Sequence, residues 1–169
     1  SHMIGAQNVR EACLVLARSA PYFPAGSIHL VVVDPGVGTA RRPMAARIGS
    51  SYFVGPDNGV ITLWHERTQA GEDGMSFVHL DRPEFWRPEV SRVFHGRDIF
   101  APVAGHLAAG VRLQDMGSAI HDPVLLDIPR ARRLPHGLEG EIIHVDHFGN
   151  LASNILLEDV PVAPVDHGR

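Results

Sequence analysis

The chain of 169 residues contains one cysteine, Cys13, and no lysine, so all 15 of its basic residues are arginines. A single cysteine excludes an internal disulfide, and the place of Cys13 on the apolar side of a predicted helix indicates a buried side chain. No stretch approaches the length of about eighteen apolar residues that a membrane span needs, and no basic start precedes an apolar core and a cleavage site. We therefore expect no membrane span, no signal peptide and a cytoplasmic location.

Charge and short motifs exclude several further classes of protein. The net charge is −4 and the arginines are spread along the chain, which leaves no basic footprint for a nucleic acid. The histidines form no H-x-x-x-H or H-E-x-x-H pattern, and His144 with Asp146 is weak evidence for a metal-dependent hydrolase. No third glycine follows Gly36 and Gly38 at the spacing of a dinucleotide fingerprint. We expect a small-molecule ligand, with neither a metal nor a redox cofactor.

The most informative segment of the chain runs from Ser27 to Arg42. The apolar, β-branched stretch Ser27–Val33 predicts a strand buried on both faces, and it ends at Asp34, after which a Pro/Gly turn leads to Arg41. In open α/β sheets, ligands bind just beyond the carboxyl ends of such strands. Asp34 is therefore a candidate site residue, although taken alone it also fits a residue that only stabilises a turn.

Helix and strand patterns alternate along most of the chain. Asn8 and Glu11 form a capping-box pattern before apolar residues that keep helical spacing up to Ala20. Further elements are expected as a strand over Arg47–Val54, a helix over Val60–Glu66 and a strand over Ser76–Leu80, with irregular chain over Pro83–Pro88. These patterns predict an α/β fold with a mostly parallel sheet flanked by helices.

A second candidate segment, Phe94–Asp98, precedes another predicted helix. Asp98 is expected to cap a helix over Ile99–Ala109, and Gly110 to end it. Polar ligand atoms are often bound at a helix entrance, because backbone N–H groups and the positive end of the helix dipole collect there. His95 is thus a second candidate, although one histidine among eleven has little weight alone.

The composition changes near residue 128. We expect an α/β domain over residues 1–128, a linker rich in Pro, Arg and Gly over 129–137, and the beginning of a small β-barrel-like domain over 138–169. In that last part, the strand-like runs Glu141–Val145 and Leu151–Ile155 flank a turn over Asp146–Asn150. We expect this C-terminal domain to be incomplete within the 169 residues.

Four motifs stand in order along the chain: D-P-G-V-G-T from Asp34 with Arg41 after it, G-P-D-N-G from Gly55, F-H-G-R-D-I-F-A-P from Phe94, and D-H-F-G-N-L from Asp146. In this order they closely resemble the S-adenosylmethionine hydroxide adenosyltransferase family, which is related to the fluorinases and chlorinases. The resemblance covers nearly the whole chain, from about Ile4 to Ile155.

This resemblance implies a function and an assembly. It implies two-domain subunits in a homotrimer with the ligand between neighbours, and hydrolysis of S-adenosylmethionine to adenosine and L-methionine without a metal. The site residues it implies are Asp34, Arg41 and His95 in catalysis, Phe94 and Gly96 near the reacting carbon, and Asp146, Phe148 and Asn150 at the methionine or adenine portions. It also implies that a first strand–helix region, with an acidic ribose-binding motif, and the far end of the C-terminal domain lie outside these residues.

The residue types fit such a reaction. A sulfonium leaves as a neutral thioether and needs no general acid, so the demand falls on water, a poor nucleophile with a pKa of about 15.7. The carboxylate of Asp34 and the imidazole of His95 can share the proton that water loses, while Arg41 holds the carboxylate by a bidentate contact.

Two other functions stay open at this point. One is a non-catalytic nucleoside-binding module of the same fold, and the other is halide-dependent adenosyl transfer of the chlorinase or fluorinase type. In the halide-using relatives the positions of Asp34 and His95 hold other residue types, so the resemblance favours water as the nucleophile.

Overall fold

The computed structural model describes residues 4–69 and 74–160. The chain divides into two compact units, with the boundary between Leu126 and Asp127. Among the described residues, no helix is both long and apolar enough to cross a membrane.

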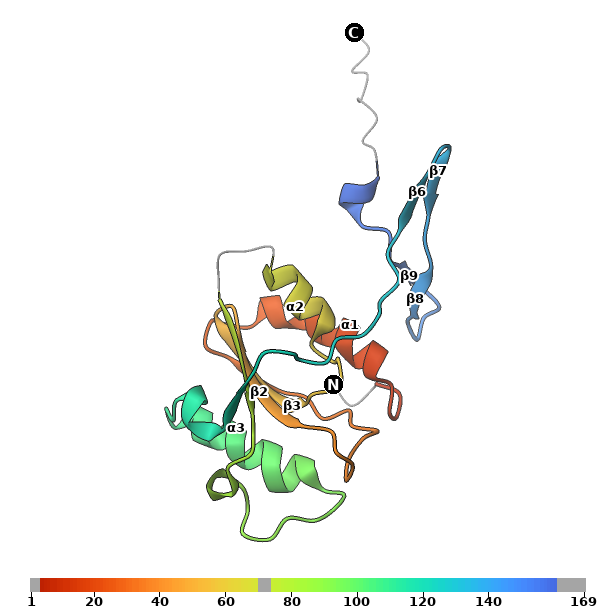
Figure 1. Cartoon of the computed structure of the whole chain (residues 1–169). Coiled ribbons are helices and arrows are strands. Elements are labelled where there is room, and N and C mark those ends of the chain that lie inside the picture. Colours follow the sequence, from red (N-terminus) through yellow and green to blue (C-terminus); the bar gives the residue numbers. More distant parts are fainter. Residues whose placement is uncertain (1–3, 70–73, 161–169) are drawn as a thin grey trace. The chain divides into compact units, whose positions relative to one another are not determined.

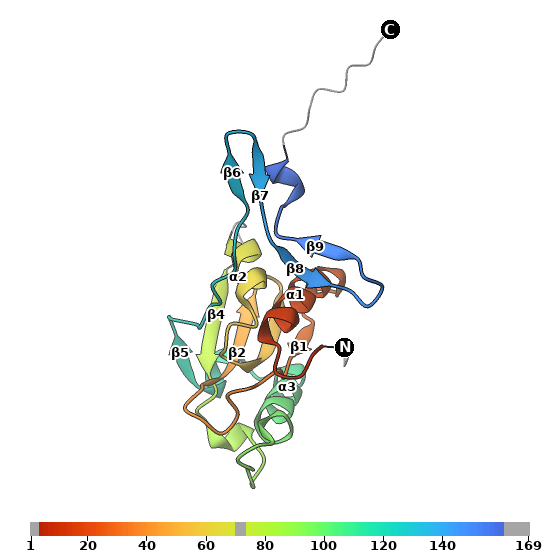
Figure 2. The same ribbon diagram turned by 90° about the vertical axis from the view of Figure 1, so that its right-hand side faces the viewer.

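The first unit is built on a five-stranded sheet with the strand order β1-β3-β2-β4-β5 (Figure 1). Its strands are β1 (Ile28–Leu30), β2 (Pro43–Ile48), β3 (Ser51–Pro56), β4 (Met75–His79) and β5 (Ser118–Ile120). Figure 2 shows the strands side by side, from β5 at the left to β1 at the right. Only β1 and β3 are parallel, and the other neighbours are antiparallel. The sheet is therefore mixed and mostly antiparallel, and the expectation of a mostly parallel sheet is wrong.

A tight turn inside the segment expected as one strand, Arg47–Val54, is a main cause of this difference. Gly49 has a φ of 58°, which glycine adopts easily, and together with Ser50 it turns the chain back so that Ile48 pairs with Ser51. A two-residue turn joins antiparallel strands, whereas parallel neighbours need a long crossover. The single strand expected from the sequence is in fact the end of β2 and the beginning of β3.

Strand β1 is shorter and less covered than the sequence predicts. Its regular part ends at Leu30, although the N–H of Val31 still donates to the carbonyl of Val54 at 3.0 Å. It lies at the edge of the described sheet, where Leu30 and Val32 are 45% and 44% exposed. An apolar, β-branched run is typical of a strand covered on both faces. It does not indicate whether the strand has a paired strand on one side or on both. The expected burial on both faces is thus wrong for the described residues.

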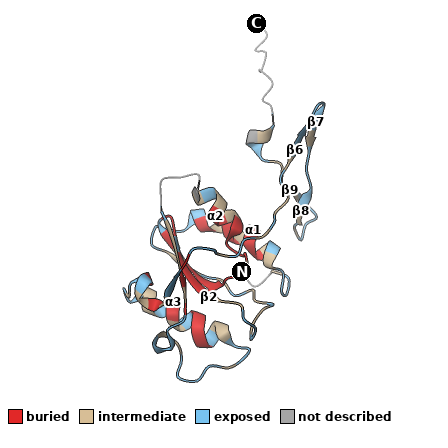
Figure 3. Ribbon diagram, viewed as in Figure 1, coloured by how far each residue is buried: buried red, intermediate tan, exposed pale blue. Residues whose placement is uncertain are grey.

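Helices cover both faces of this sheet. Helices α1 (Val9–Ser19) and α2 (Thr62–Gln69) pack on one face and α3 (Ala101–Ala108) on the other (Figure 1). The alternation along β2 separates two cores, since Met44 and Ile48 pack with the first pair of helices and Ala45 with α3. Figure 3 shows the buried positions concentrated on the sheet and on the sides of the helices that face it.

Helix α1 confirms the cap at Asn8 but not the reciprocal bond of a capping box, because the N–H of Asn8 donates to the carbonyl of Gly5. The side chain of Asn8 accepts a hydrogen bond from the N–H of Glu11 at 3.0 Å, and the carboxylate of Glu11 accepts one from the N–H of Gly5 at 2.9 Å. Cys13 is fully buried on this helix, as predicted. The cap and the apolar stripe are both local in sequence, so the prediction needs no knowledge of the fold.

The second unit contains two hairpins. The strands β6 (Arg132–Leu134) and β7 (Gly137–Glu139) form one, and β8 (Ile142–Val145) and β9 (Leu151–Ser153) form the other. Part of the segment expected as a linker, residues 129–137, is therefore the strand β6.

Candidate active site

The turn after β1 brings Arg41 back to Asp34. The N–H of Val37 donates to the carbonyl of Asp34 at 3.3 Å, and the N–H of Thr39 to that of Gly36 at 3.1 Å. Gly38 has a φ of 77°, and a Cβ added there would lie 2.8 Å from the carbonyl oxygen of Arg92. The turn needs glycine at that position and packs against the segment that leads to His95.

The guanidinium of Arg41 grips the carboxylate of Asp34 through two hydrogen bonds. Its Nε donates to Oδ1 at 3.1 Å and its Nη2 donates to Oδ2. The two side chains are only 7% and 5% exposed, so this bidentate pair is screened from solvent. The Cζ of Arg41 also lies 5.4 Å from the centre of the Phe100 ring, which covers the cation. The carboxylate of Asp34 is therefore held by a guanidinium that is itself packed against an aromatic ring.

His95 completes the cluster that we call the Asp34 site, which comprises Asp34, Arg41 and His95. The Nη2 of Arg41 lies 3.2 Å from the Nδ1 of His95, although the two residues are 54 positions apart in sequence. Burial, and then the charge of Arg41, lower the pKa of His95 below its usual range, while Asp34 and Asp98 act in the opposite direction. Since the usual pKa is already near 6.5, His95 is neutral at pH 7.

One donor of the Asp34 site has no acceptor among the described residues. The Nη1 of Arg41 is buried and makes no hydrogen bond in that part of the chain. A buried N–H without a partner is costly, and native structures satisfy nearly all such groups with protein, water or ligand atoms. The site is thus a carboxylate, an imidazole and a spare donor, which suits an oxygen atom of a small molecule.

The structure places Asp98 differently from the sequence prediction. It does not cap the helix, because its own N–H donates to the carbonyl of Phe94 at 3.0 Å within a π-helical turn, Gly96–Phe100, that leads into α3. Its fully buried carboxylate accepts from the N–H of Ser91 at 2.8 Å and from the Nε of Arg97 at 2.7 Å. These bonds lower the pKa of Asp98 to about 2. Asp98 therefore ties down the segment that carries His95.

Phe94 and Gly96, predicted near the reacting carbon, flank His95 in the chain. Phe94 is 58% exposed, and the Cζ of Arg97 lies 5.2 Å from the centre of its ring. A Cβ added to Gly96 would lie 3.3 Å from a methyl group of Val32, so this backbone passes close to the end of the segment that leads to Asp34. A larger residue at this position would press on Val32.

The other predicted binding residues, Asp146, Phe148 and Asn150, lie in the second unit, in the turn between β8 and β9. The Oδ1 of Asp146 accepts from the N–H groups of Phe148 at 2.9 Å and Asn150 at 2.8 Å, and its Oδ2 accepts from the side chain of Asn150 at 2.8 Å. These bonds lower the pKa of Asp146. Phe148 is 81% exposed, so the turn presents an aromatic ring on a rigid base.

Sequence reasoning missed the role of the G-P-D-N-G segment. The side-chain amide of Asn58 donates to the carbonyl of Val33 at 2.8 Å, directly before Asp34. Asp57 is 3% exposed and accepts from the Nε of Arg42 at 2.8 Å and from the N–H of Val124 at 2.8 Å. The motif was visible as a turn, but no spacing rule connects residue 58 with residue 33.

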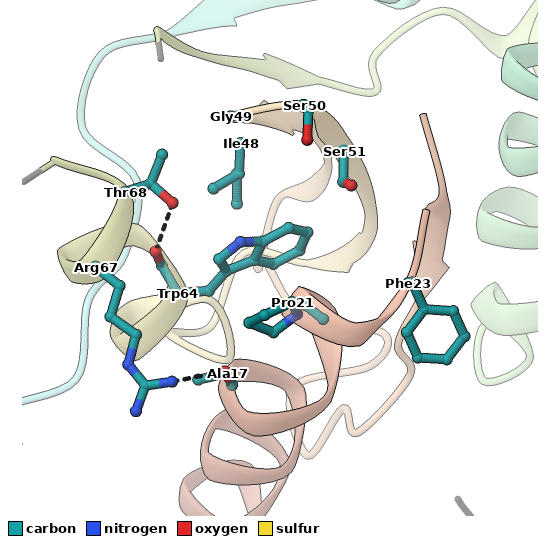
Figure 4. Close-up of a pocket in the computed structure, with 11 residues that line it drawn as sticks. Ala17, Pro21, Phe23, Ile48, Gly49, Ser50, Ser51, Trp64, Arg67 and Thr68 are labelled. Carbon is teal, nitrogen blue, oxygen red and sulfur yellow. Dashed lines mark hydrogen bonds between the residues drawn. The ribbon is translucent and has the colours of Figure 1, made fainter. Parts of the chain in front are cut away.

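Two cavities lie away from the Asp34 site. One of about 330 Å³ is bordered by the ends of α1 and α2 and by the turn between β2 and β3, with Trp64 at its centre (Figure 4). Arg67 at this cavity donates to the carbonyl of Ala17 at 2.7 Å and so joins α2 to α1. The other, of about 240 Å³, lies between Tyr52 and the end of α3 at Leu107. Neither is lined by a residue of the Asp34 site.

Residues 1–117 match the N-terminal domain of the SAM hydroxide adenosyltransferases, where SAM stands for S-adenosylmethionine. That match spans more than half of the 169 residues. The chain belongs to this family. The Asp34 site lies wholly within the matched residues.

Relatives of this family are similar over most of the chain. The (R)-S-adenosyl-L-methionine hydrolase of Salinispora tropica is 43% identical over 166 residues, which are 95% of this chain and 62% of that protein. A fluorinase of Actinopolyspora mzabensis is 27% identical over 99% of this chain and 64% of its own length. The crystal structure of an uncharacterized conserved protein from Thermotoga maritima matches with a TM-score of 0.83 and 37% identity, over 92% of this chain and 58% of that one. The chain thus spans about three fifths of the length of these relatives.

Proposed function

We propose that the Asp34 site hydrolyses S-adenosyl-L-methionine to adenosine and L-methionine by attack of water on C5′. The observation that carries the proposal is the convergence of a buried carboxylate, an imidazole and the unsatisfied Nη1 donor of Arg41 at one place. An (R)-S-adenosyl-L-methionine hydrolase that is 43% identical over 95% of this chain supports the choice of substrate.

The site supplies what the reaction demands. Water must lie in line with the C5′–S bond and must lose a proton during attack, because it is a poor nucleophile with a pKa of about 15.7. A carboxylate held by Arg41 is fixed in position before the substrate arrives, so little reorganisation is needed in the transition state. As the oxygen attacks, the positive charge on sulfur is neutralised, and this dispersal of charge is favoured where the surroundings exclude bulk water.

The remaining predicted residues are proposed to bind the substrate. Phe94 and Gly96 adjoin His95 and would contact the ribose near C5′. Asp146, Phe148 and Asn150 would contact the methionine or adenine portions from the second unit, where the exposed ring of Phe148 suits stacking on a planar base. The second unit would thus take part in binding the substrate.

We further propose that the protein acts as a homotrimer in which a neighbouring subunit completes the substrate site. The exposed apolar residues Val93 at 60%, Phe94 at 58% and Val32 at 44% support this, since they lie in the segments that carry His95 and Asp34. Light scattering coupled to size-exclusion chromatography measures the mass. A monomer at enzymatic concentrations that still turns over substrate would contradict the shared site.

The hydrolysis is tested by incubating the protein with S-adenosylmethionine of each configuration at sulfur, in ¹⁸O-labelled water with chloride present. Mass spectrometry should find one ¹⁸O atom in the adenosine and none in the methionine. Formation of 5′-chloro-5′-deoxyadenosine would indicate halide transfer instead. Binding of adenosine without turnover of either epimer would indicate a nucleoside-binding module.

A further inference from the structure

The hydrogen bond between Arg41 and His95 determines which nitrogen of the imidazole carries a proton. A guanidinium has only donors, so the Nδ1 that lies 3.2 Å from the Nη2 of Arg41 must present its lone pair. A neutral imidazole has one N–H, and here it has to be on Nε2. Building on the proposed function, we infer that His95 acts in the site as a hydrogen-bond donor through Nε2 and that Asp34 alone accepts the proton of water.

Burial, and then the charge of Arg41, favour this neutral form of His95. Three charged groups act on the ring: Arg41, which opposes protonation, and Asp34 and Asp98, which favour it. Together with burial they leave the pKa of His95 below its usual range. Protonation would also place an N–H on Nδ1 against the N–H of Arg41, where two donors face each other without an acceptor. The imidazole has therefore no free lone pair with which to act as a base.

As far as the described residues go, the carboxylate of Asp34 does have free acceptor positions. Each carboxylate oxygen has two lone pairs, and Arg41 uses one on each. In the reaction the bond between the water oxygen and C5′ forms, the C5′–S bond breaks, and its electron pair stays on sulfur as the thioether of methionine. The proton of water passes to the carboxylate of Asp34 and then to solvent. The Nε2–H of His95 occupies one lone pair of the water oxygen, so that the other lone pair faces carbon.

The tautomer is measured directly by NMR on the full chain labelled with ¹⁵N-histidine. Long-range ¹H–¹⁵N correlation distinguishes protonated from unprotonated ring nitrogens, and comparison with the spectrum of His95→Gln identifies the signals of His95. Above pH 6.5 we expect an unprotonated Nδ1 and a protonated Nε2. A proton on Nδ1 would overturn the inference while leaving the proposed hydrolysis standing, with His95 as its base.

Substitution of the two neighbouring arginines supplies a matched pair for this measurement. Arg41→Met removes the donor to Nδ1, so the signals of His95 should move toward a mixture of tautomers and its pKa should rise. Arg42→Met, which removes the adjacent cation that bonds to Asp57 instead, should leave both unchanged. Equal effects of the two substitutions would contradict the claim that Arg41 determines the tautomer of His95. If Arg41→Met does not fold, the wild-type spectrum alone decides which tautomer is present.

Activity separates the roles of donor and base. The side-chain amide of His95→Gln can donate a hydrogen bond in place of Nε2 but cannot take up a proton, whereas His95→Met does neither. If His95 acts as a donor, kcat should fall by about tenfold or less in the Gln variant, which is the scale of one imperfect hydrogen bond, and by more in the Met variant. If His95 acts as a base, kcat should fall by about 10²- to 10⁴-fold in both variants. If the wild type releases no adenosine, the proposed function fails while the tautomer measurement still stands.

Discussion

Two consecutive arginines, Arg41 and Arg42, each bind the buried side chain of an aspartate. They differ in whether every nitrogen of the guanidinium has a hydrogen-bond acceptor. Arg42 donates from Nε to Asp57 at 2.8 Å, from Nη1 to the side chain of Asp122 at 2.9 Å and from Nη2 to its carbonyl at 2.7 Å. Arg41 uses Nε and Nη2 and leaves a buried Nη1 without a partner among the described residues. One cluster is satisfied within the described residues, and the other keeps a buried donor that has no partner there.

The surroundings of the two clusters differ in the same sense. Asp57 also accepts from the backbone of Val124, so its pair with Arg42 connects the end of β3 with the segment after β5. Asp34 has Arg41 as its partner and His95 beside it, and no further backbone donor to its carboxylate is seen in the described part of the chain. We therefore expect Arg42 and Asp57 to matter for stability, and Arg41 and Asp34 for turnover.

The largest expected effect is that of Asp34→Asn on turnover. The amide keeps the shape of the side chain but cannot accept the proton of water, so kcat should fall by about 10²- to 10⁴-fold. Adenosine binding, measured by calorimetry, should persist, because the proposed contacts to the nucleoside lie elsewhere.

Asp57→Asn is the control for Asp34→Asn, since it changes the aspartate of the other cluster, whose side chain is 0% exposed against 5% for that of Asp34. It should lower the melting temperature and leave the kcat of the folded protein nearly unchanged. Loss of adenosine binding in Asp34→Asn, with retention in Asp57→Asn, would show that Asp34 is a scaffold residue and would remove its catalytic assignment.

The next largest effect is the decrease that Arg42→Met should cause in the free energy of unfolding. Removing this arginine leaves Asp57 buried without its cation, and because Arg42 itself is 30% exposed the loss is put at about 1–3 kcal/mol. Denaturant unfolding measures this loss. A stable Arg42→Met with strongly reduced kcat would reverse the roles of the two clusters.

Asp98 gives a smaller effect that depends on pH. Its pKa is lowered to about 2 from 3.8, so its charged form stabilises the fold above about pH 4 and this contribution is lost as the pH falls through about 2. The difference in melting temperature between wild type and Asp98→Asn should therefore be largest above pH 4 and shrink toward pH 2. Asp115→Asn, at an exposed pair with Arg112, is the control and should show a smaller difference throughout. A difference for Asp98→Asn that does not change with pH would show that its charge has no role.

The sequence predicted those features whose causes are local. The cap of α1 at Asn8 follows from a pattern three residues long. The Asp34–Arg41 contact spans seven residues around a Pro/Gly turn, and this contact was predicted only after the family resemblance was recognised. The expectation of one strand over Arg47–Val54 overlooks the reversal at Gly49, although Gly-Ser between two strand-like runs is itself a local signal of a two-residue turn.

Features that depend on long-range packing were not available from local patterns. His95 meets Arg41 across 54 residues, and it was identified through the resemblance, since a lone histidine has no distinguishing periodicity. Asp98 was interpreted as a helix cap because an aspartate before an apolar run is typical of one. The π-helical turn that contains Asp98 begins earlier, at Gly96, and its partners Ser91 and Phe94 lie only seven and four residues before it, so this error comes from the local pattern and not from long-range packing.

The smallest expected effect tests how the backbone before Asp34 is held. Asn58→Ala removes the hydrogen bond to the carbonyl of Val33, at a cost of about 1 kcal/mol, and it should lower kcat by about tenfold or less because Asp34 is then less well positioned. Asn8→Ala removes the cap of α1 at a similar cost in stability of about 1 kcal/mol, and it should leave kcat unchanged. Comparing the two variants at equal stability separates positioning from folding. Equal kcat values in both would mean that the Asp34 site keeps its geometry without Asn58, and that Arg41 alone determines where the carboxylate lies.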